Sequence, residues 1–307
     1  MVDQLATTRE QSLPSDIRKQ YPFMGRLLQL ENGVQMHYLD EGRGSPILFV
    51  HGNPTWSFYW RHLVRDLMED HRCIVPDHIG CGLSDKPQEY PYTLAQHIEN
   101  LSTLIDALDL RDITLVVHDW GGPIGLGAAL RYPDRFRRIV LFNTGCFEGP
   151  IPAEIRMCRW PVIGALSIRG LNGFVRGGLL RATADRSRFA GVVAKGYLFP
   201  YGNWADRIAN LRFIEDIPLE ESHPTRKLFL GIGEQIREFK HLPIQILWGE
   251  KDFCFVPHYR HGFVARWPDA EVHVFQDAAH WVVEDAHEKI LPLMRAFFAK
   301  HPLGVQA

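Results

Sequence analysis

The feature that most constrains the fold is the alternation of short apolar runs with segments of helix length. This alternation favours a mainly parallel sheet covered by helices. An Asn-Gly pair in Glu31-Asn32-Gly33 also indicates a hairpin between the first two runs. The runs predict eight strands: Leu27–Leu30, Val34–Leu39, Ile47–Val50, Arg72–Pro76, Ile113–His118, Ile139–Asn143, Ile244–Trp248 and Val272–Phe275. Helices are expected at Trp60–Met68, Ala95–Leu108, Pro123–Tyr132 and Glu284–Lys300.

The spacing of the strands breaks between Asn143 and Ile244, where about a hundred residues stand in place of a short crossover. Residues 146–217 have helical patterning and are rich in Gly, Arg and aromatic residues. We therefore expect a core domain of residues 21–145 and 218–307, with residues 146–217 as a helical cap. Because ligands of open α/β sheets bind at the carboxyl ends of the strands, the cap would roof the site. Residues 1–20 are expected to form a polar tail.

Composition excludes several classes of function. A formal charge of −2 over 307 residues, with scattered Lys and Arg, offers no field for nucleic acid or for an anionic membrane. No apolar stretch has the ~20 residues of a membrane span, and none at the start resembles a signal peptide. The five cysteines lack metal-ligand spacing, so we expect reduced thiols in a cytoplasmic protein. No metal or organic cofactor is expected.

The most informative segment is the end of the Ile113–His118 strand, which passes directly into a helical pattern through Asp119-Trp120-Gly121-Gly122. This is the context of a nucleophile elbow, a strained strand-to-helix turn that lifts one side chain above the sheet. Asp119 occupies the position of the nucleophile, and Val117 replaces the usual first glycine. The alternative is an aspartate that only caps the following helix.

Two further residues follow strands in the order that this fold uses for its partners, which is nucleophile, acid, histidine. His280 comes after the last strand, and Asp252 comes four residues after Trp248. Glu250 is a rival for the acid, and a solvent-facing turn is the simpler explanation for Asp252. The loop His51-Gly52-Asn53, after the third strand, is expected to supply a backbone N–H to an oxyanion hole; its simpler reading is a Gly-Asn-Pro turn.

A carboxylate nucleophile suits attack on an sp³ carbon that bears a leaving group. It needs no base for this step, because its ordinary pKa is ~3.9. The product would be an alkyl ester of Asp119, which water activated by His280 would hydrolyse while Asp252 orients the imidazole. The indole N–H of Trp120 and the side-chain amide of Asn53 are candidate halide donors. An epoxide hydrolase would instead need cap tyrosines, for which Tyr197 and Tyr201 are the candidates.

From about Met24 to Phe298 the chain resembles the haloalkane dehalogenase family. The blocks that carry this resemblance are His51–Trp56, Asp77–Pro87 and His118–Gly122. The resemblance implies an α/β-hydrolase fold and hydrolysis of a carbon–halogen bond to an alcohol and halide. Its implied ligands are a small hydrophobic substrate and a halide ion. It assigns Asp119 as nucleophile, His280 as base, Asp252 as acid, and Asn53 with Trp120 as the halide pair.

The position of the acid in this chain is similar to that in the third subgroup of the family: the acid is Asp252, and Asn143 stands where another subgroup has Glu. This subgroup also resembles the β-lactone decarboxylases of bacterial olefin biosynthesis, which have the same site residues. The cap stretches 203–207 and 213–218 look like that branch. Haloalkane dehalogenation is the main hypothesis, and β-lactone decarboxylation to an alkene and carbon dioxide is the alternative. Other cap residues are candidates for a tunnel lining or a homo-oligomer contact: Arg156, Trp160, Phe174, Arg176 and Phe189.

Overall fold

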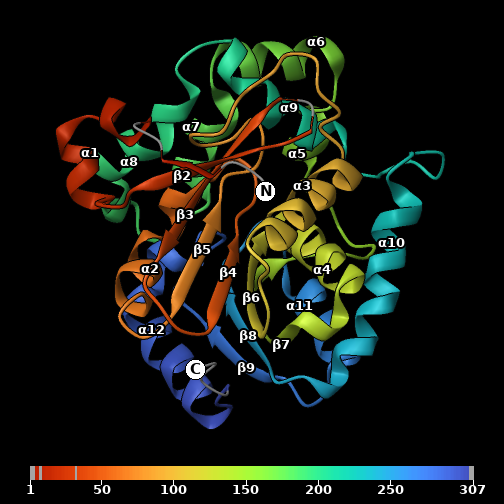
Figure 1. The fold of residues 1–307 in the computed structure, drawn as a ribbon. Helices are drawn as coiled ribbons and strands as arrows, with labels where there is room; N and C mark the ends of the chain where they lie inside the picture. The colour runs from red at the N-terminus through yellow and green to blue at the C-terminus, as the bar shows by residue number, and fades with distance from the viewer. Residues whose placement is uncertain (1–3, 7–8, 32, 304–307) are drawn as a thin grey trace.

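The computed structural model describes residues 4–6, 9–31 and 33–303, which form one mixed sheet, helices on both of its faces, and a group of helices beyond one end (Figure 1). This arrangement is the expected α/β-hydrolase fold. Its strands are β1 (Gln4–Ala6), β2 (Gly25–Gln29), β3 (Gln35–Glu41), β4 (Pro46–Val50), β5 (Arg72–Pro76), β6 (Ile113–Asp119), β7 (Phe136–Thr144), β8 (Ile244–Gly249) and β9 (Glu271–Phe275).

The strands lie in the order β1-β2-β3-β5-β4-β6-β7-β8-β9. β1, β2 and β3 pair antiparallel, and β3 joins β5 in the same way. All pairs from β5 to β9 are parallel. Every residue of β6 is buried, which is typical of a parallel strand covered on both faces. The carboxyl ends of β4, β6, β7 and β8 therefore meet at one edge of the sheet.

The α-helices include all four that the sequence predicted, each within about two residues of its expected ends. They are α1 (Ser15–Gln20), α2 (Arg61–Leu67), α3 (Leu94–Ala107), α4 (Gly121–Arg131), α5 (Ala153–Met157), α6 (Pro161–Gly164), α7 (Gly173–Arg181), α8 (Val192–Leu198), α9 (Ile208–Glu215), α10 (Arg226–Gln235), α11 (Pro257–Arg266) and α12 (Val282–Lys300). Shorter helical turns are η1 (Arg9–Ser12), η2 (Ser57–Trp60), η3 (Pro133–Arg135), η4 (Ala165–Gly170), η5 (Arg186–Phe189), η6 (Phe199–Tyr201), η7 (Ala205–Arg207) and η8 (Ile236–His241).

The N-terminal region differs from the expected polar tail, and it adds a ninth strand to the eight expected. β1 extends the sheet beyond β2, and α1 packs with its Ile17 buried. Leu13, just before α1, is buried in the same apolar core as Ile17. The expected hairpin joins β2 to β3, with Gly33 at a positive φ of 80°. Asn32, on which that prediction also rested, lies outside the described residues.

Two apolar cores lie on opposite faces of the sheet, because successive side chains of a strand point to opposite sides. Leu48 and Val50 of β4 join the core under α3 and α4, whereas Ile47 and Phe49 join the core under α2 and α12. A third, smaller cluster holds the helices of residues 146–217 together: Ile155, Ile168, Leu211 and Ile214.

No described helix is both long and apolar enough to cross a membrane. Within the described ranges, no group of three His, Cys, Asp or Glu side chains could hold a metal ion. All five cysteines fall inside those ranges and are free thiols.

Candidate active site

The turn between β6 and α4 places Asp119 in a strained conformation at the carboxyl edge of the sheet. Its φ is 52°, a left-handed value that few residues other than glycine adopt. The turn closes only because its next residues are small. A Cβ on Gly121 would lie 2.0 Å from the carbonyl oxygen of Val50, and one on Gly122 would lie 1.9 Å from Oγ1 of Thr144. Strain held in place by close packing is typical of a functional position, as the elbow prediction requires.

The structure brings His280 and Asp252 to Asp119 from the loops that follow β9 and β8. Nδ1 of His280 lies 2.9 Å from Oδ2 of Asp252, and Nε2 lies 3.7 Å from Oδ2 of Asp119. The backbone N–H groups of Cys254 and Phe255 donate to Oδ1 of Asp252, at 2.6 and 3.0 Å. Asp252 is thus fixed on both oxygens, with one of them facing His280.

Glu250, the rival acid, does not reach His280. Its carboxylate forms an ion pair with Arg260 of α11. Asn143, at the end of β7, makes a two-way bridge to β8: its Nδ2 donates to the carbonyl oxygen of Gly249 at 2.9 Å, and the Gly249 N–H donates to its Oδ1 at 2.8 Å. This bridge ties the strand end just before the Asp252 turn to the neighbouring strand.

Burial and neighbouring charges together shift the pKa values of this cluster. It raises the pKa of Asp119, whereas the charge of His280 and the backbone N–H groups of Trp120 and Asn53 lower it, with a net upward shift. Burial lowers the pKa of His280. The charge and hydrogen bond of Asp252, together with the charge of Asp119, raise it by more than burial lowers it, so the net shift is upward. His118, whose Nε2 lies 2.8 Å from the His280 carbonyl oxygen, stays neutral because burial takes its pKa well below the usual value.

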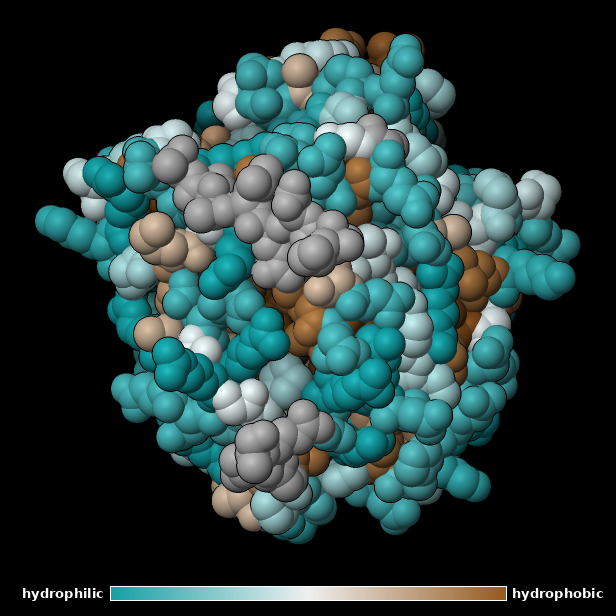
Figure 2. Space-filling model, in the orientation of Figure 1, coloured by the Kyte–Doolittle hydropathy of each residue, from teal (hydrophilic) through white to brown (hydrophobic). Residues whose placement is uncertain are grey.

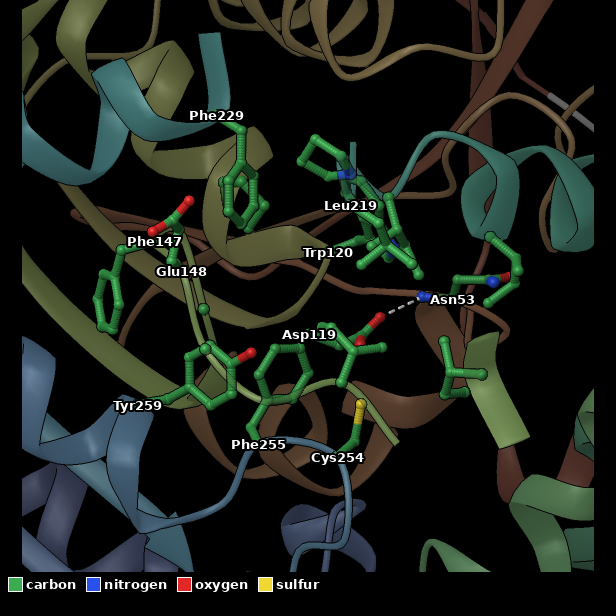
Figure 3. A pocket seen from close by; sticks show the side chains of 18 of the residues that line it. Asn53, Asp119, Trp120, Phe147, Glu148, Leu219, Phe229, Cys254, Phe255 and Tyr259 are labelled. Carbon is green, nitrogen blue, oxygen red and sulfur yellow. Dashed lines mark hydrogen bonds between the residues drawn. The ribbon is translucent and has the colours of Figure 1, made fainter. Parts of the chain in front are cut away.

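The loop after β4 brings Asn53 against the same carboxylate. The Asn53 backbone N–H donates to Oδ1 of Asp119 at 2.7 Å, as Figure 3 shows. The side-chain Nδ2 of Asn53 donates to the carbonyl oxygen of Asn210 in α9 at 3.2 Å, so the helix above the sheet fixes the amide. One N–H of that amide remains for a ligand.

A cavity of about 240 Å³ opens in front of Asp119, Asn53 and Trp120 (Figure 3). Its walls are mainly apolar and come from both the core and the segment expected to be a cap: Pro123, Phe147, Ile151, Ile155, Phe174, Ile214, Ile217, Pro218, Leu219, Phe229, Leu230, Cys254, Phe255 and Tyr259. The exposed side chains Glu148 and Arg156 mark its solvent end, where Glu148 pairs with Arg226. His280 and Asp252 are buried nearby and do not line the cavity.

Of the five cap residues considered for a tunnel, Arg156 and Phe174 line the cavity. Trp160 is exposed, and Phe189 is buried against Tyr197 and Trp281. Sequence reasoning missed Phe147, Cys254, Phe255 and Tyr259. A signal for the first three was present, because each follows closely on β7 or β8 at the edge of the sheet where ligands bind.

The tyrosines that an epoxide hydrolase would need face elsewhere. The hydroxyl of Tyr197 donates to Oε1 of Glu284 at 2.5 Å, and Tyr201 is fully buried. Neither is among the described residues that line the cavity. Tyr259 does line it, but its hydroxyl donates to the carbonyl oxygen of Pro150 at 3.2 Å. The epoxide hypothesis therefore loses the proton donors on which it depended.

Comparison with known proteins supports the fold and identifies the family. Residues 45–161 match the alpha/beta hydrolase fold. The chain is 41% identical over 286 residues to a cis-3-alkyl-4-alkyloxetan-2-one decarboxylase of Shewanella oneidensis, covering 91% of this chain and 89% of the other. It is 32% identical over 275 residues to haloalkane dehalogenase 2 of Mycobacterium tuberculosis, covering 88% and 93%.

Among solved structures, a mutant haloalkane dehalogenase of Agrobacterium tumefaciens superimposes with a TM-score of 0.82 at 27% identity, over 90% of this chain and 96% of the other. The comparisons favour the alternative hypothesis, β-lactone decarboxylation, over the main one, because the decarboxylase relatives are the more similar. The chain belongs to the family of α/β-hydrolase-fold enzymes that contains the haloalkane dehalogenases and the cis-3-alkyl-4-alkyloxetan-2-one decarboxylases.

Proposed function

We propose that this protein is a β-lactone decarboxylase that converts a 3,4-dialkyl oxetan-2-one into an alkene and carbon dioxide. The observation that carries the proposal is the 41% identity, over nine-tenths of the chain, to a relative named for that activity. The site supports it chemically: a buried carboxylate, Asp119, faces an apolar cavity with room for alkyl groups. An oxetanone is neutral and apolar apart from its ring oxygen and its carbonyl oxygen, so it suits such walls.

The reaction needs only the carboxylate as nucleophile. Asp119 attacks the ring carbon that bears the ring oxygen, that carbon–oxygen bond breaks, and the opened ring carries a free carboxylate. The carbon–carbon bond to this carboxylate then breaks, and its electron pair forms the alkene. The bond between the alkyl group and Asp119 breaks in the same step, which releases carbon dioxide and restores the Asp119 carboxylate. No water or proton is consumed.

The neighbours of Asp119 have distinct tasks in this scheme. Burial raises the pKa of Asp119, and the charge of His280 opposes this shift and so favours the ionised carboxylate that attacks. Asp252 holds the imidazole in place through the 2.9 Å contact to Nδ1. The side-chain amide of Asn53 and the indole of Trp120 line the cavity beside Asp119 and are the candidate donors to the carboxylate that leaves.

Haloalkane dehalogenation is the second candidate, and a specific observation favours it: relatives of that name are 32% identical over 88% of the chain. The same donors suit a halide. The two reactions differ in their use of water, because hydrolysis of the Asp119 ester needs a water activated by His280, whereas the alkene-forming route needs none.

A paired assay tests the proposal. Purified protein is given a cis-dialkyl β-lactone in one arm, and 1-bromohexane and 1,2-dibromoethane in the other, with Asp119→Ala as the blank in both. We expect alkene and carbon dioxide from the lactone, with bromide release at a trace level. Bromide release that dominates, with no alkene, would move the protein to the dehalogenases.

Heavy-oxygen water separates the two routes on the protein itself. Turnover by ester hydrolysis places the label in the carboxylate of Asp119, and mass spectrometry of the peptide that contains Asp119 detects it. Lactone turnover should leave this carboxylate unlabelled. Label that accumulates in proportion to alkene formed would contradict the water-free scheme.

A further inference from the structure

Seven exposed apolar side chains gather on the outer face of the helices above the sheet. We call them the cap patch: Met157, Trp160, Val162, Ile163, Leu166, Leu171 and Trp204. The exposed fraction reaches 56% for Trp160, 69% for Val162 and 73% for Leu171. Figure 2 shows hydrophobic side chains at the top of the molecule, where Figure 1 places α6. Single exposed apolar residues are common, but a cluster of this size marks an interaction surface.

The patch lies on the outside of a segment whose inside builds the site. Ile155 lines the cavity, and Ile168 of η4 is fully buried in the small apolar cluster. Ile163 and Leu166, on the same helical turns, point outward and are about half exposed. The buried residues of this segment therefore form its inner apolar cluster, and Ile163 and Leu166 are not members of that cluster.

Positive charge lies beside the patch. Residues 151–181 contain five arginines and one glutamate, Glu154. Arg159 forms an ion pair with Glu220, and Arg181 forms one with Glu154. Arg156, Arg169 and Arg176 are the arginines of this segment that add positive charge to the surface. The guanidinium of Arg169 lies 4.7 Å from the centre of the Trp204 ring. Burial and the charge of Arg212 lower the pKa of Arg169, while Glu215 opposes this shift. Burial and the charge of Arg176 lower the pKa of Arg207, while Asp206 opposes it. The low total charge of the chain conceals this local excess.

We propose that the cap patch docks on an anionic lipid surface. A surface that enters the headgroup region of a membrane typically combines exposed aliphatic side chains and tryptophans with arginines that face the lipid phosphates. The cap patch has two tryptophans and lies beside arginines. The proposal rests on the proposed function, because a lactone with two alkyl chains collects in a membrane. Arg156 lines the cavity, and Met157 follows it on the surface, so docking brings the cavity wall to the lipid.

Vesicle co-sedimentation of the full chain tests the proposal. The probes are phosphatidylcholine vesicles with and without about one third phosphatidylglycerol. We expect binding to the anionic vesicles, a loss of at least about tenfold when NaCl rises from about 0.05 to about 0.5 M, and little binding to pure phosphatidylcholine. The double variant Ile163→Ser with Leu166→Ser should bind at least about tenfold more weakly. The matched control is Met24→Ser, which removes an exposed methionine just before β2, outside the cap patch. This variant should bind like the parent.

Two outcomes would overturn the proposal: no binding to the anionic vesicles, or binding that the double variant leaves unchanged. A parent protein that is dimeric by light scattering, with a monomeric double variant and no vesicle binding, would assign the patch to a contact between copies. Activity separates this inference from the proposed function. The double variant should keep its turnover of a short-chain lactone in solution and lose turnover of a long-chain lactone supplied in vesicles. Failure of the parent on both lactones would instead contradict the proposed function.

Discussion

Two buried histidines of this protein each lie between two carboxylates, and their geometries differ. Nδ1 of His37 lies 2.8 Å from Asp77 and its Nε2 lies 2.6 Å from Glu10. Nδ1 of His280 makes a similar 2.9 Å contact, to Asp252, but its Nε2 stands 3.7 Å from Asp119. The second distance is too long for a hydrogen bond. Asp119 also faces the cavity, whereas no member of the His37 group does.

The comparison shows that residue types alone do not make an active site. In the His37 group both ring nitrogens have acceptors, and Asp77 also accepts the backbone N–H groups of Ser57 and Leu83. Such a cluster is satisfied and stabilises the junction of β3 and β5. In the His280 group, the carboxylate of Asp119 makes only a loose contact with His280 and faces the open cavity, and the backbone of Asp119 is strained. These are the conditions for chemistry on a ligand.

Asp119→Ala should have the largest effect. We expect turnover of the lactone to fall by at least about 10⁴-fold, because the nucleophile is lost. Stability should stay unchanged or rise, because the variant removes a buried carboxylate whose pKa burial has raised. Alkene release by gas chromatography and urea unfolding are the two measurements. Turnover within tenfold of the parent would contradict the mechanism.

His37→Phe should show the reverse pattern. It leaves the carboxylate of Asp77 buried without its cation, which costs about 3–5 kcal/mol of unfolding free energy, while the kcat of the folded fraction stays near that of the parent. The matched control is His97→Phe. Neither ring nitrogen of His97 has a hydrogen-bond partner among the described residues, and its ring stacks on Phe213 at 4.5 Å. The control should change stability by less than about 1 kcal/mol. Equal losses in both variants would remove the distinction between the two sites.

The two clusters should also respond to pH in opposite directions. Burial lowers the pKa of His37, but Asp77 and Glu10 raise it, to about 9 from 6.5. A raised pKa stabilises the folded state below pH 6.5, and this contribution is lost as the pH rises through about 9. Urea unfolding should show a loss on the order of 2–3 kcal/mol across this window, and His37→Phe should flatten it. Activity should instead fall as the pH drops through the raised pKa of Asp119, because the protonated carboxyl cannot attack.

The sequence predicted the fold well for a physical reason. Buried parallel strands are continuous apolar runs, so the ends of β4, β5, β6 and β8 were predicted to within one residue. β7 begins three residues before its predicted start. The order of Asp119, Asp252 and His280 along the chain follows from the topology, and the structure brings all three together. Their roles stay predictions. The His37 group could not be predicted, since Glu10, His37 and Asp77 share no motif and meet only through sheet pairing.

The region above the sheet was harder to predict than the core. Its helices α5 and α6 are only five and four residues long, too short for a periodic pattern to define. The direction of Tyr197 depends on Glu284 of α12, a contact between residues far apart in the chain. The positive charge beside the cap patch was not predicted either, because a net charge averaged over the whole chain cancels a local excess.

Asn143→Ala should have the smallest effect, and it probes how the His280 group is held. The variant leaves the N–H and carbonyl of Gly249 without their side-chain partner, which costs about 2 kcal/mol of stability. Because Asp252 lies three residues beyond Gly249, we also expect kcat to fall by about tenfold with little change in KM. A structural role alone would not alter the imidazole, so its NMR titration is the deciding measurement. Looser contact with Asp252 should lower the pKa of His280, and an unchanged titration would confine Asn143 to stability.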